Sequence, residues 1–198
     1  MNIEKVQISE DILPYYIIGL TGRNASGKGA VASLLTKRSF SYHSLSDTLR
    51  TKLAEEGIEE SRENLIAIGN RLREEGGPGV LADLMRENIV TPNDHIVDSI
   101  RNPYEVSSLR REYDNHSFCL IAVDAKPEVR FKRLSERNRK GDSSSWEQFL
   151  AQEKLEESSD NPNKQQLLAT INEADYVIDN SGNLDDLENN LREILDNL

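Results

Sequence analysis

Two glycines and a lysine near the start of the chain have the spacing of a loop that wraps around an anion. Four residues separate Gly22 from Gly27, and Lys28 follows directly, which gives the frame G-x-x-x-x-G-K. Glycines let successive backbone N–H groups turn towards an anion, and the start of a following helix adds partial positive charge. We therefore expect this loop to bind a nucleoside triphosphate. The expected binding residues are Gly22, Arg23, Asn24, Ala25, Ser26, Gly27, Lys28, Gly29 and Ala30.

Magnesium is the metal that such a loop suggests, although one of its usual ligands is missing. Gly29 stands where many loops of this frame have a Ser or Thr that offers a hydroxyl to Mg²⁺. Asp98 ends an apolar run, where a carboxylate can hold Mg²⁺ or its waters against a triphosphate. We expect Asp98 to be the metal residue. The alternative for Asp98 is a carboxylate that caps a turn. The alternative for the glycine loop is a loop that keeps its shape but binds no ligand.

Several arginines have positions that suit contacts with further phosphates. Arg101 lies three residues after Asp98 and could clamp a second phosphate in bidentate fashion. Asp47 and Arg50 are also three residues apart, hence on nearly the same face of a helix. We expect this pair to bind a phosphorylated acceptor at the far side of a cleft. A surface ion pair is the alternative.

A stripe of positive charge stands out in this acidic chain. Arg130, Arg133 and Arg137 recur at i, i+3 and i+7, with Arg139 and Lys140 just beyond. One interpretation is a solvated helix face. The other is a mobile cover that brings arginines to a phosphoryl group during its transfer, because that transition state needs charge neutralisation more than covalent help.

The elements that must position these residues follow from the pattern of apolar residues. Short apolar runs alternate with helical segments, without repeats or a linker, which predicts a single three-layer α/β domain over residues 1–198 with a five-stranded parallel sheet. The expected strands are residues 15–20, 42–45, 95–98, 118–123 and 176–179. The expected helices are residues 28–37, 47–56, a stretch from 61 that ends at Gly76, and 80–90, 104–113, 127–137, 146–157, 163–173 and 184–198.

Such a sheet gathers the candidate residues at one edge. In open parallel sheets, ligands bind beyond the carboxyl ends of the strands. The loop from Gly22, the pair Asp47 and Arg50, the segment 98–101 and the turn at Asn180 all follow expected strands. We therefore expect one cleft that holds all four.

Composition excludes several classes of partner. Of 198 residues, 30% are charged, and 35 Asp and Glu against 24 Lys and Arg give a net charge of −11. Such acidity disfavours nucleic acid as a partner. No apolar run approaches the ~20 residues of a membrane span, and no signal peptide is evident, so we expect a cytoplasmic location. Cys119 is the single cysteine and lies in an apolar run, where we expect a buried structural thiol.

The motifs together resemble the P-loop nucleoside and deoxynucleoside monophosphate kinase family. The segment from Gly22 to Gly29 matches the adenylate-kinase type of loop, which also has Gly after its lysine. Residues 44–50 look like the family's segment ending D-x-L-R, residues 98–101 like its D-G-x-x-R segment, and residues 130–139 like its lid. Two positions depart from the pattern: Ala30 replaces a Thr, and Ser99 replaces a Gly.

Other stretches are similar to relatives of that family. Residues 175–182 look like the adenine-side turn of dephospho-coenzyme A kinases and of bacteriophage deoxynucleotide monophosphate kinases. Residues 62–72 resemble the R-x-x-L-x-x-x-G-x-x-L helix of the deoxynucleotide kinases. Residues 98–105 also resemble kinase-like domains joined to deoxycytidylate deaminases, although no deaminase zinc motif is present.

The resemblance implies a P-loop NTPase fold with a short lid at about residues 130–145, and phosphoryl transfer from ATP, with Mg²⁺, to a (deoxy)nucleoside monophosphate. A dephospho-coenzyme A kinase and a nucleotide-binding regulatory module without phosphoryl transfer are the alternatives. The expected partner is a small-molecule nucleotide, and a homodimer is left open. The implied catalytic residues are Lys28, Arg101, Arg133 and Arg137. ATP would also contact Arg139 and Asn180, the acceptor would contact Asp47, Arg50 and Arg101, and Asp98 would serve the metal.

Overall fold

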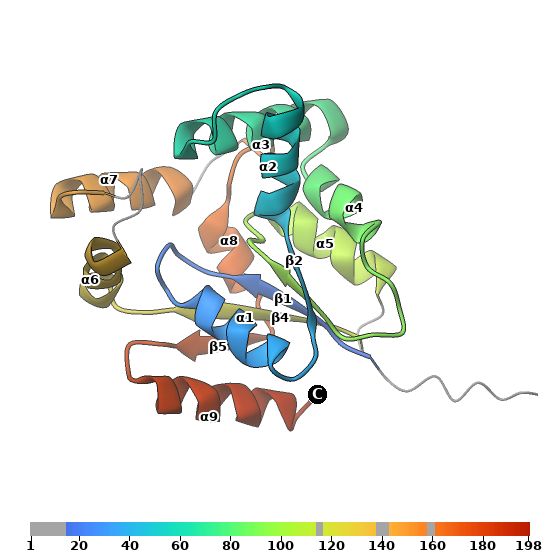
Figure 1. Ribbon diagram of the computed structural model, residues 1–198, viewed down its shortest axis with the longest axis vertical. Helices are drawn as coiled ribbons and strands as arrows, with labels where there is room; N and C mark the ends of the chain where they lie inside the picture. Colours follow the sequence, from blue (N-terminus) through green and yellow to red (C-terminus); the bar gives the residue numbers. More distant parts are fainter. Residues whose placement is uncertain (1–14, 114–116, 138–142, 158–160) are drawn as a thin grey trace, which may run out of the picture.

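The computed structural model describes residues 15–113, 117–137, 143–157 and 161–198, and within them one five-stranded sheet (Figure 1). The order of the strands is β2-β3-β1-β4-β5, and every neighbouring pair is parallel. The strands are β1 (Ile17–Thr21), β2 (Ser41–Ser44), β3 (His95–Asp98), β4 (Phe118–Asp124) and β5 (Tyr176–Asp179). The predicted α/β class with a five-stranded parallel sheet is confirmed.

Helices cover both faces of the sheet, which explains why the central strands are apolar throughout. All five residues of β1 are buried. On one face, α1 (Lys28–Thr36) and α9 (Leu184–Leu195) supply Val31, Leu35, Leu187 and Leu191 to a core cluster. On the other face, α4 (Val80–Arg86) and α5 (Pro103–Glu112) supply Leu81, Met85, Val106 and Leu109 to a second cluster.

The remaining helices lie on two sides of the sheet's carboxyl edge (Figure 1). On one side, α2 (Leu45–Glu55) and α3 (Arg62–Gly76) stand with α4. A serine side chain caps the N-terminus of each of α2 and α3. Ser44 accepts a hydrogen bond from Ser46 N, and Ser61 accepts one from Asn64 N. On the other side lie α6 (Pro127–Arg137) and α7 (Trp146–Glu157), and α8 (Leu167–Asn172) leads into β5.

Three helices are clearly shorter than the sequence predicts, and one of them, the helix expected over residues 184–198, ends at Leu195. The helix expected over residues 80–90 ends at Arg86, because the chain tightens there: Asn88 and Ile89 donate to carbonyls three residues back. The helix expected over residues 163–173 begins only at Leu167. The backbone of the preceding segment makes a hydrogen bond outside the helix, since Gln166 N donates to the carbonyl of Arg101.

Arg130 corrects the predicted arginine stripe. Its side chain is 2% exposed, donates to the carbonyl of Ala125 and forms an ion pair with Glu153 of α7. Its guanidinium carbon also lies 5.3 Å from the centre of the Phe149 ring. Arg130 therefore joins α6 to α7 and does not belong to a solvated helix face. Residues 138–142 of the predicted lid, with Arg139, and residues 1–13 lie outside the described residues.

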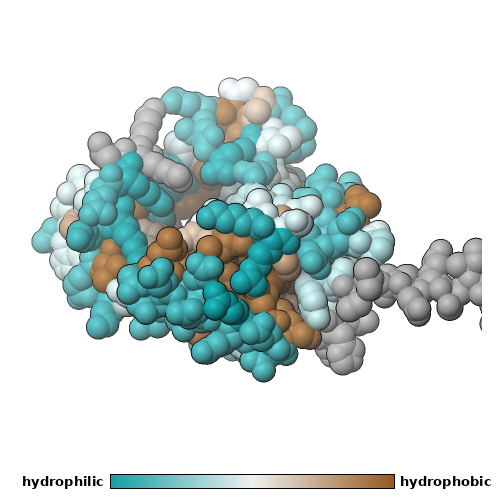
Figure 2. Space-filling model, turned by 60° about the horizontal axis from the view of Figure 1, so that its bottom comes forward, coloured by the Kyte–Doolittle hydropathy of each residue, from teal (hydrophilic) through white to brown (hydrophobic). Residues whose placement is uncertain are grey.

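The face drawn in Figure 2 is largely hydrophilic, with apolar residues gathered towards its middle. Within the part of the chain that the structure describes, none of the helices has the length and apolar character needed to cross a bilayer. Cys119 is buried in the core on the α1 side of the sheet, as its apolar neighbours predict.

Candidate functional site

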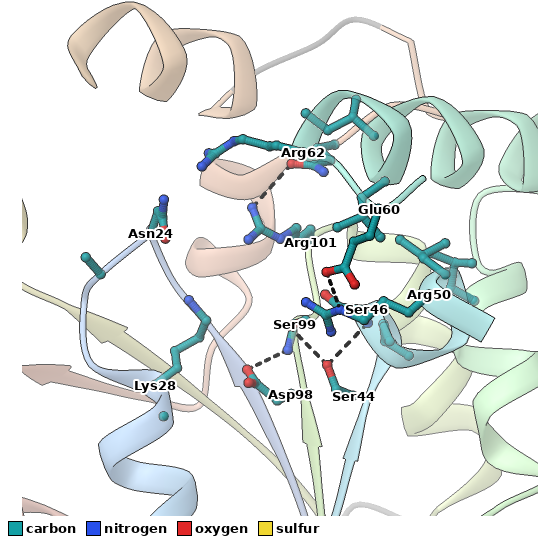
Figure 3. A pocket seen from close by; sticks show the side chains of 18 of the residues that line it. Asn24, Lys28, Ser44, Ser46, Arg50, Glu60, Arg62, Asp98, Ser99 and Arg101 are labelled. Carbon is teal, nitrogen blue, oxygen red and sulfur yellow. Dashed lines mark hydrogen bonds and ion pairs between the residues drawn. The ribbon is translucent and has the colours of Figure 1, made fainter. Parts of the chain in front are cut away.

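A cleft of about 1230 Å³ opens beyond the carboxyl ends of β1, β2 and β3 (Figure 3). Its lining comes from the loop after β1, from β2 and α2, from the start of α3 and from the segment after β3. A pocket for one drug-sized ligand has about 300–1,000 Å³. The cleft therefore has room for two small molecules side by side.

The loop between β1 and α1 has a backbone that only glycine fits at two positions. Gly22 has φ 134° and Gly27 has φ 108°, both in the left-handed region. A Cβ on Gly22 would lie 2.0 Å from the carbonyl oxygen of Val123, and one on Gly27 would lie 2.0 Å from Nδ2 of Asn180. Ala25, with φ 57°, adds a third left-handed residue. The loop is thus bent back on itself around the start of α1.

The start of α1 has the features of an anion site. Gly27 is its N-cap and gives no side-chain cap, whereas Ser44, Ser61, Asn102 and Asn183 cap α2, α3, α5 and α9. The first N–H groups of an uncapped helix point at whatever lies beyond its end. The Lys28 ammonium donates to the carbonyls of Gly22 (2.7 Å) and Arg23 (3.0 Å). It therefore lies over the loop, and Figure 3 shows it pointing into the cleft.

Residues from the second half of the chain hold the loop from behind. Arg133 donates to the carbonyls of Ser26 (3.1 Å) and Asn180 (2.8 Å), and Asn180 Nδ2 donates to the carbonyl of Ser26 (2.8 Å). Arg23 forms an ion pair with Asp124 at the end of β4. These contacts give the loop a fixed shape before any ligand binds.

Asp98 is held by two donors at the floor of the cleft. Tyr42 donates its hydroxyl to Oδ2 (3.0 Å), and Ser99 N donates to Oδ1 (2.6 Å). Burial and the neighbouring Asp98 charge raise the pKa of Tyr42 to about 12. Ser99 has φ 68°, which explains why a Gly would be usual there, and its Oγ accepts a hydrogen bond from Ser44 Oγ (3.3 Å).

The donor set suits a metal held mainly by phosphates and water. The described residues contain no group of three or more His, Cys, Asp or Glu that could hold a metal ion. Mg²⁺ typically keeps several waters and takes one or two carboxylates together with substrate phosphates. A Cβ added to Gly29 would meet nothing within 4 Å, so the space that a Ser or Thr side chain would fill is open to the cleft. Asp98 and this space fit hydrated Mg²⁺ on a triphosphate.

The opposite wall of the cleft combines arginines with apolar side chains. Arg50, Arg62 and Arg101 line it together with Leu49, Leu65 and Ile66. Arg50 is held by Asp47 (2.7 Å) and Glu60 (2.9 Å). Arg101 donates to Gln165 Oε1 (3.4 Å). Such a wall can bind an anionic group and a flat apolar one at the same time.

The structure brings most of the predicted site residues to this cleft. Those that line it are Asn24, Ala25, Gly27, Lys28, Gly29, Ala30, Arg50, Asp98, Arg101, Arg133 and Arg137. Others lie behind the lining and hold it: Gly22, Arg23, Ser26, Asp47 and Asn180. Arg137 donates to Asn24 Oδ1 (3.1 Å) at the rim. That these residues bind ATP, acceptor or metal stays a prediction.

Several residues of the site were not predicted from the sequence, among them Arg62, which lines the cleft. Tyr42 contacts Asp98, and Arg73 of α3 lines the cleft while it is paired with Glu105 of α5. Glu105 had a sequence signal, since Asn102 and Glu105 have the spacing of a capping box. Tyr42 had none, because a Tyr in a short edge strand predicts no partner.

The chain is similar in sequence to known proteins. A family model described as an AAA domain (AAA_18) matches residues 18–150. The chain is 33% identical over 183 residues to the UPF0200 protein PF1294 of Pyrococcus furiosus, which covers 90% of this chain and 95% of that protein. It is 35% identical over 144 residues to the UPF0200 protein PH1008 of Pyrococcus horikoshii, with 71% and 77% covered.

Two solved structures share the fold at low identity. Shikimate kinase from Bacteroides thetaiotaomicron superposes with a TM-score of 0.56 at 13% identity, covering 91% of this chain and 97% of that one. TT1252 from Thermus thermophilus gives 0.54 at 23% identity, covering 93% and 98%. The fold is that of P-loop kinases, and the chain belongs to the AAA domain family (AAA_18) and to the UPF0200 proteins.

Proposed function

We propose that the protein transfers a phosphoryl group from Mg²⁺·ATP to a small phosphorylated acceptor, a nucleoside or deoxynucleoside monophosphate. The observation that carries this proposal is the composition of a single cleft. An uncapped helix start with Lys28 forms one wall, and the arginines at positions 50, 62 and 101 form the other. A cleft with two separate anion sites suits two phosphorylated molecules that react with each other.

On the donor side, the chain binds and orients the triphosphate. The N–H groups at the start of α1 and the Lys28 ammonium bind its β- and γ-phosphates. For this, Lys28 exchanges its contacts with the carbonyls of Gly22 and Arg23 for phosphate oxygens. When bound, Mg²⁺ supplies charge neutralisation between the phosphates. Asp98, fixed by Tyr42 and Ser99, is the residue that would hold that ion.

On the acceptor side, arginines bind the monophosphate and leave its terminal oxygen facing the donor. Arg50 and Arg101 provide the forked N–H groups that match phosphate oxygens. Arg137 lies on the rim and approaches the transferring group. Arg133 acts from behind the loop, since its guanidinium contacts loop carbonyls. Positioning and electrostatic stabilisation are what phosphoryl transfer requires.

The test is an acceptor screen with purified protein, Mg²⁺·ATP, the ribonucleoside and deoxyribonucleoside monophosphates, and dephospho-coenzyme A. Formation of a diphosphate from at least one monophosphate is the expected result. Turnover of dephospho-coenzyme A alone would make the protein a dephospho-coenzyme A kinase, for which the volume of the cleft leaves room. No turnover of any acceptor would refute the proposed transfer.

A regulatory module that binds nucleotide without transferring phosphate is the second candidate. Two observations favour it: Ala30 carries no hydroxyl, and Arg50 already has two carboxylate partners, Asp47 and Glu60. Calorimetry with ATP distinguishes it from the enzyme. Tight binding without turnover, together with a co-purifying protein partner, would support the module.

A further inference from the structure

A buried ion pair joins helix α3 to the segment that carries Arg101. Arg73 Nη2 lies 2.7 Å and Nε 3.2 Å from Glu105 Oε1. The two side chains are 4% and 0% exposed, so neither charge is compensated by bulk water. Burying two charges is costly, and apolar residues of similar size often stabilise a protein as well. The pair therefore invites an explanation other than stability.

The second carboxylate oxygen of Glu105 contacts the backbone of the acceptor site. Oε2 accepts hydrogen bonds from Arg101 N (2.9 Å) and Asn102 N (3.1 Å). One carboxylate thus holds the Arg73 guanidinium with one oxygen and the peptide of Arg101 with the other. A contact of this kind fixes the direction in which the Arg101 side chain leaves the backbone.

The other side of the same peptide is also held. The Arg101 carbonyl accepts from Gln166 N (2.9 Å), and Asn102 Nδ2 donates to the carbonyls of Pro162 (2.7 Å) and Lys164 (2.9 Å). Figure 3 shows the Arg101 side chain in the cleft between Arg62 and Ser99. Arg73 lines the same cleft, and its hydrogen bonds to Glu105 connect it to the backbone of Arg101.

We propose that Arg73 and Glu105 are positioning residues for acceptor binding, which act by fixing the backbone of Arg101. The inference rests on the proposed function, because it assigns the acceptor phosphate to Arg101. Arg73 itself contributes little net charge to the cleft, since Glu105 neutralises it. Its guanidinium contacts Glu105 through two nitrogens, a geometry that lysine cannot reproduce.

The first experiment compares Arg73→Lys with the matched control Arg86→Lys. Arg86 pairs with Glu112 between α4 and α5, is 32% exposed and lies outside the cleft lining. The probe is the nucleoside monophosphate with the highest kcat/KM in the acceptor screen. We expect Arg73→Lys to raise the KM for that monophosphate about tenfold or more. Losses of this size are typical when a residue that orients a ligand-binding side chain is replaced, as at metal sites. The KM for ATP should stay within twofold, and Arg86→Lys should change neither constant.

The second experiment needs no turnover. Amide hydrogen exchange should show the N–H groups of Arg101 and Asn102 protected in the wild-type chain, because both donate to Glu105. In Arg73→Lys and in Glu105→Gln they should exchange at least tenfold faster, while the amides of β1 keep their rates. The wild-type measurement remains decisive even where a variant does not fold.

The outcomes separate this inference from the function on which it rests. Unprotected amides at Arg101 and Asn102 in the wild type would overturn the positioning role, and so would an Arg73→Lys enzyme that loses thermal stability but keeps its acceptor KM. A wild-type protein that transfers no phosphate would refute the proposed function, whatever the exchange rates. Protected amides, lost in both variants, together with a selective rise in acceptor KM, would support the inference.

Discussion

In the proposed function, Lys28 is the residue on which phosphate binding depends most directly. It is the charged group of the loop that lines the donor side of the cleft, and in the absence of nucleotide it donates to two loop carbonyls. We predict that Lys28→Ala lowers kcat by about 10²–10³-fold, the usual cost of removing one preorganised donor. A coupled assay of ADP formation measures it. A variant with full activity would contradict both the kinase and the dephospho-coenzyme A kinase hypotheses.

Tyr42 offers a test of the assignment of Asp98 to the metal. Its side chain is 45% exposed, so Tyr42→Phe removes one hydrogen bond and leaves the fold in place. We predict that about tenfold more Mg²⁺ is then needed for half-maximal nucleotide binding, because partners of a metal residue tune its affinity. Calorimetric titration of ATP at several Mg²⁺ concentrations measures the shift.

Tyr104 provides the matched control for Tyr42. It is 51% exposed and lies outside the lining of the cleft. Tyr104→Phe should therefore leave the Mg²⁺ dependence unchanged. An unchanged dependence in Tyr42→Phe as well would remove Asp98 from the metal site.

Cys119 is predicted to be inert towards thiol reagents. Burial raises the pKa of its thiol to about 12. Because the pKa is higher in the folded chain than in the unfolded chain, the thiol stabilises the fold below pH 9, and this contribution is lost as the pH rises towards 12. At pH 8 the native protein should react with a disulfide reagent far more slowly than the protein in urea. Equal rates would show that Cys119 is accessible.

At the scale of elements, helix α6 connects the loop between β1 and α1 to an aromatic cluster. Arg133 of α6 contacts the loop, while Phe131 of the same helix packs edge-on against Trp146, with ring centres 5.4 Å apart. Phe149 of α7 lies against both rings. A movement of α6 therefore changes the surroundings of Trp146.

Trp146 is the only tryptophan, so its fluorescence reports on α6 without labelling. We predict a change in its emission when Mg²⁺·ATP is added, as expected if α6 belongs to a lid. The control is Trp146→Phe, which should lose the signal and keep nucleotide affinity. Binding seen by calorimetry with an unchanged emission spectrum would mean that α6 stays fixed.

The elements also show which features local sequence patterns can predict. Apolar runs predicted the central strands β1, β3 and β4, because helices cover both faces of the sheet there. The start of α8 could not be predicted, since the bond from Gln166 N to the Arg101 carbonyl spans 65 positions. Likewise, helical periodicity placed Arg130 in a charged stripe, but only the partner Glu153 on α7 explains its burial.

The site, like the fold, was predictable only where local sequence patterns determine it. The loop, the strand end at Asp98 and the nearby Arg101 follow from motifs and from the topology of parallel sheets. The contacts of Tyr42 and Arg73 depend on which elements become neighbours in space, and spacing along the chain contains no such information.

At the scale of the whole molecule, ligand binding should stabilise the fold as one unit. The cleft takes its lining from segments on both sides of the sheet's carboxyl edge, so a bound nucleotide bridges them. At 100 times its Kd, a ligand stabilises the folded state by about 2.7 kcal/mol, which corresponds to roughly 5–10 °C in Tm for a chain of this size. We predict such a shift with Mg²⁺·ATP in a thermal melt. Lys28→Ala should show a much smaller one.

The contact between Asn180 and the carbonyl of Ser26 has a consequence for synthesis of the chain. The bond spans 154 positions, and Arg133 completes the same contact from the helix after β4. A chain emerging from the ribosome makes the glycine loop early and Asp124 and Arg133 later, but it gains Asn180, which completes these contacts, only after β5. Because domains fold as their segments become available, the nascent protein should remain unable to retain ATP until its last fifth has left the exit tunnel.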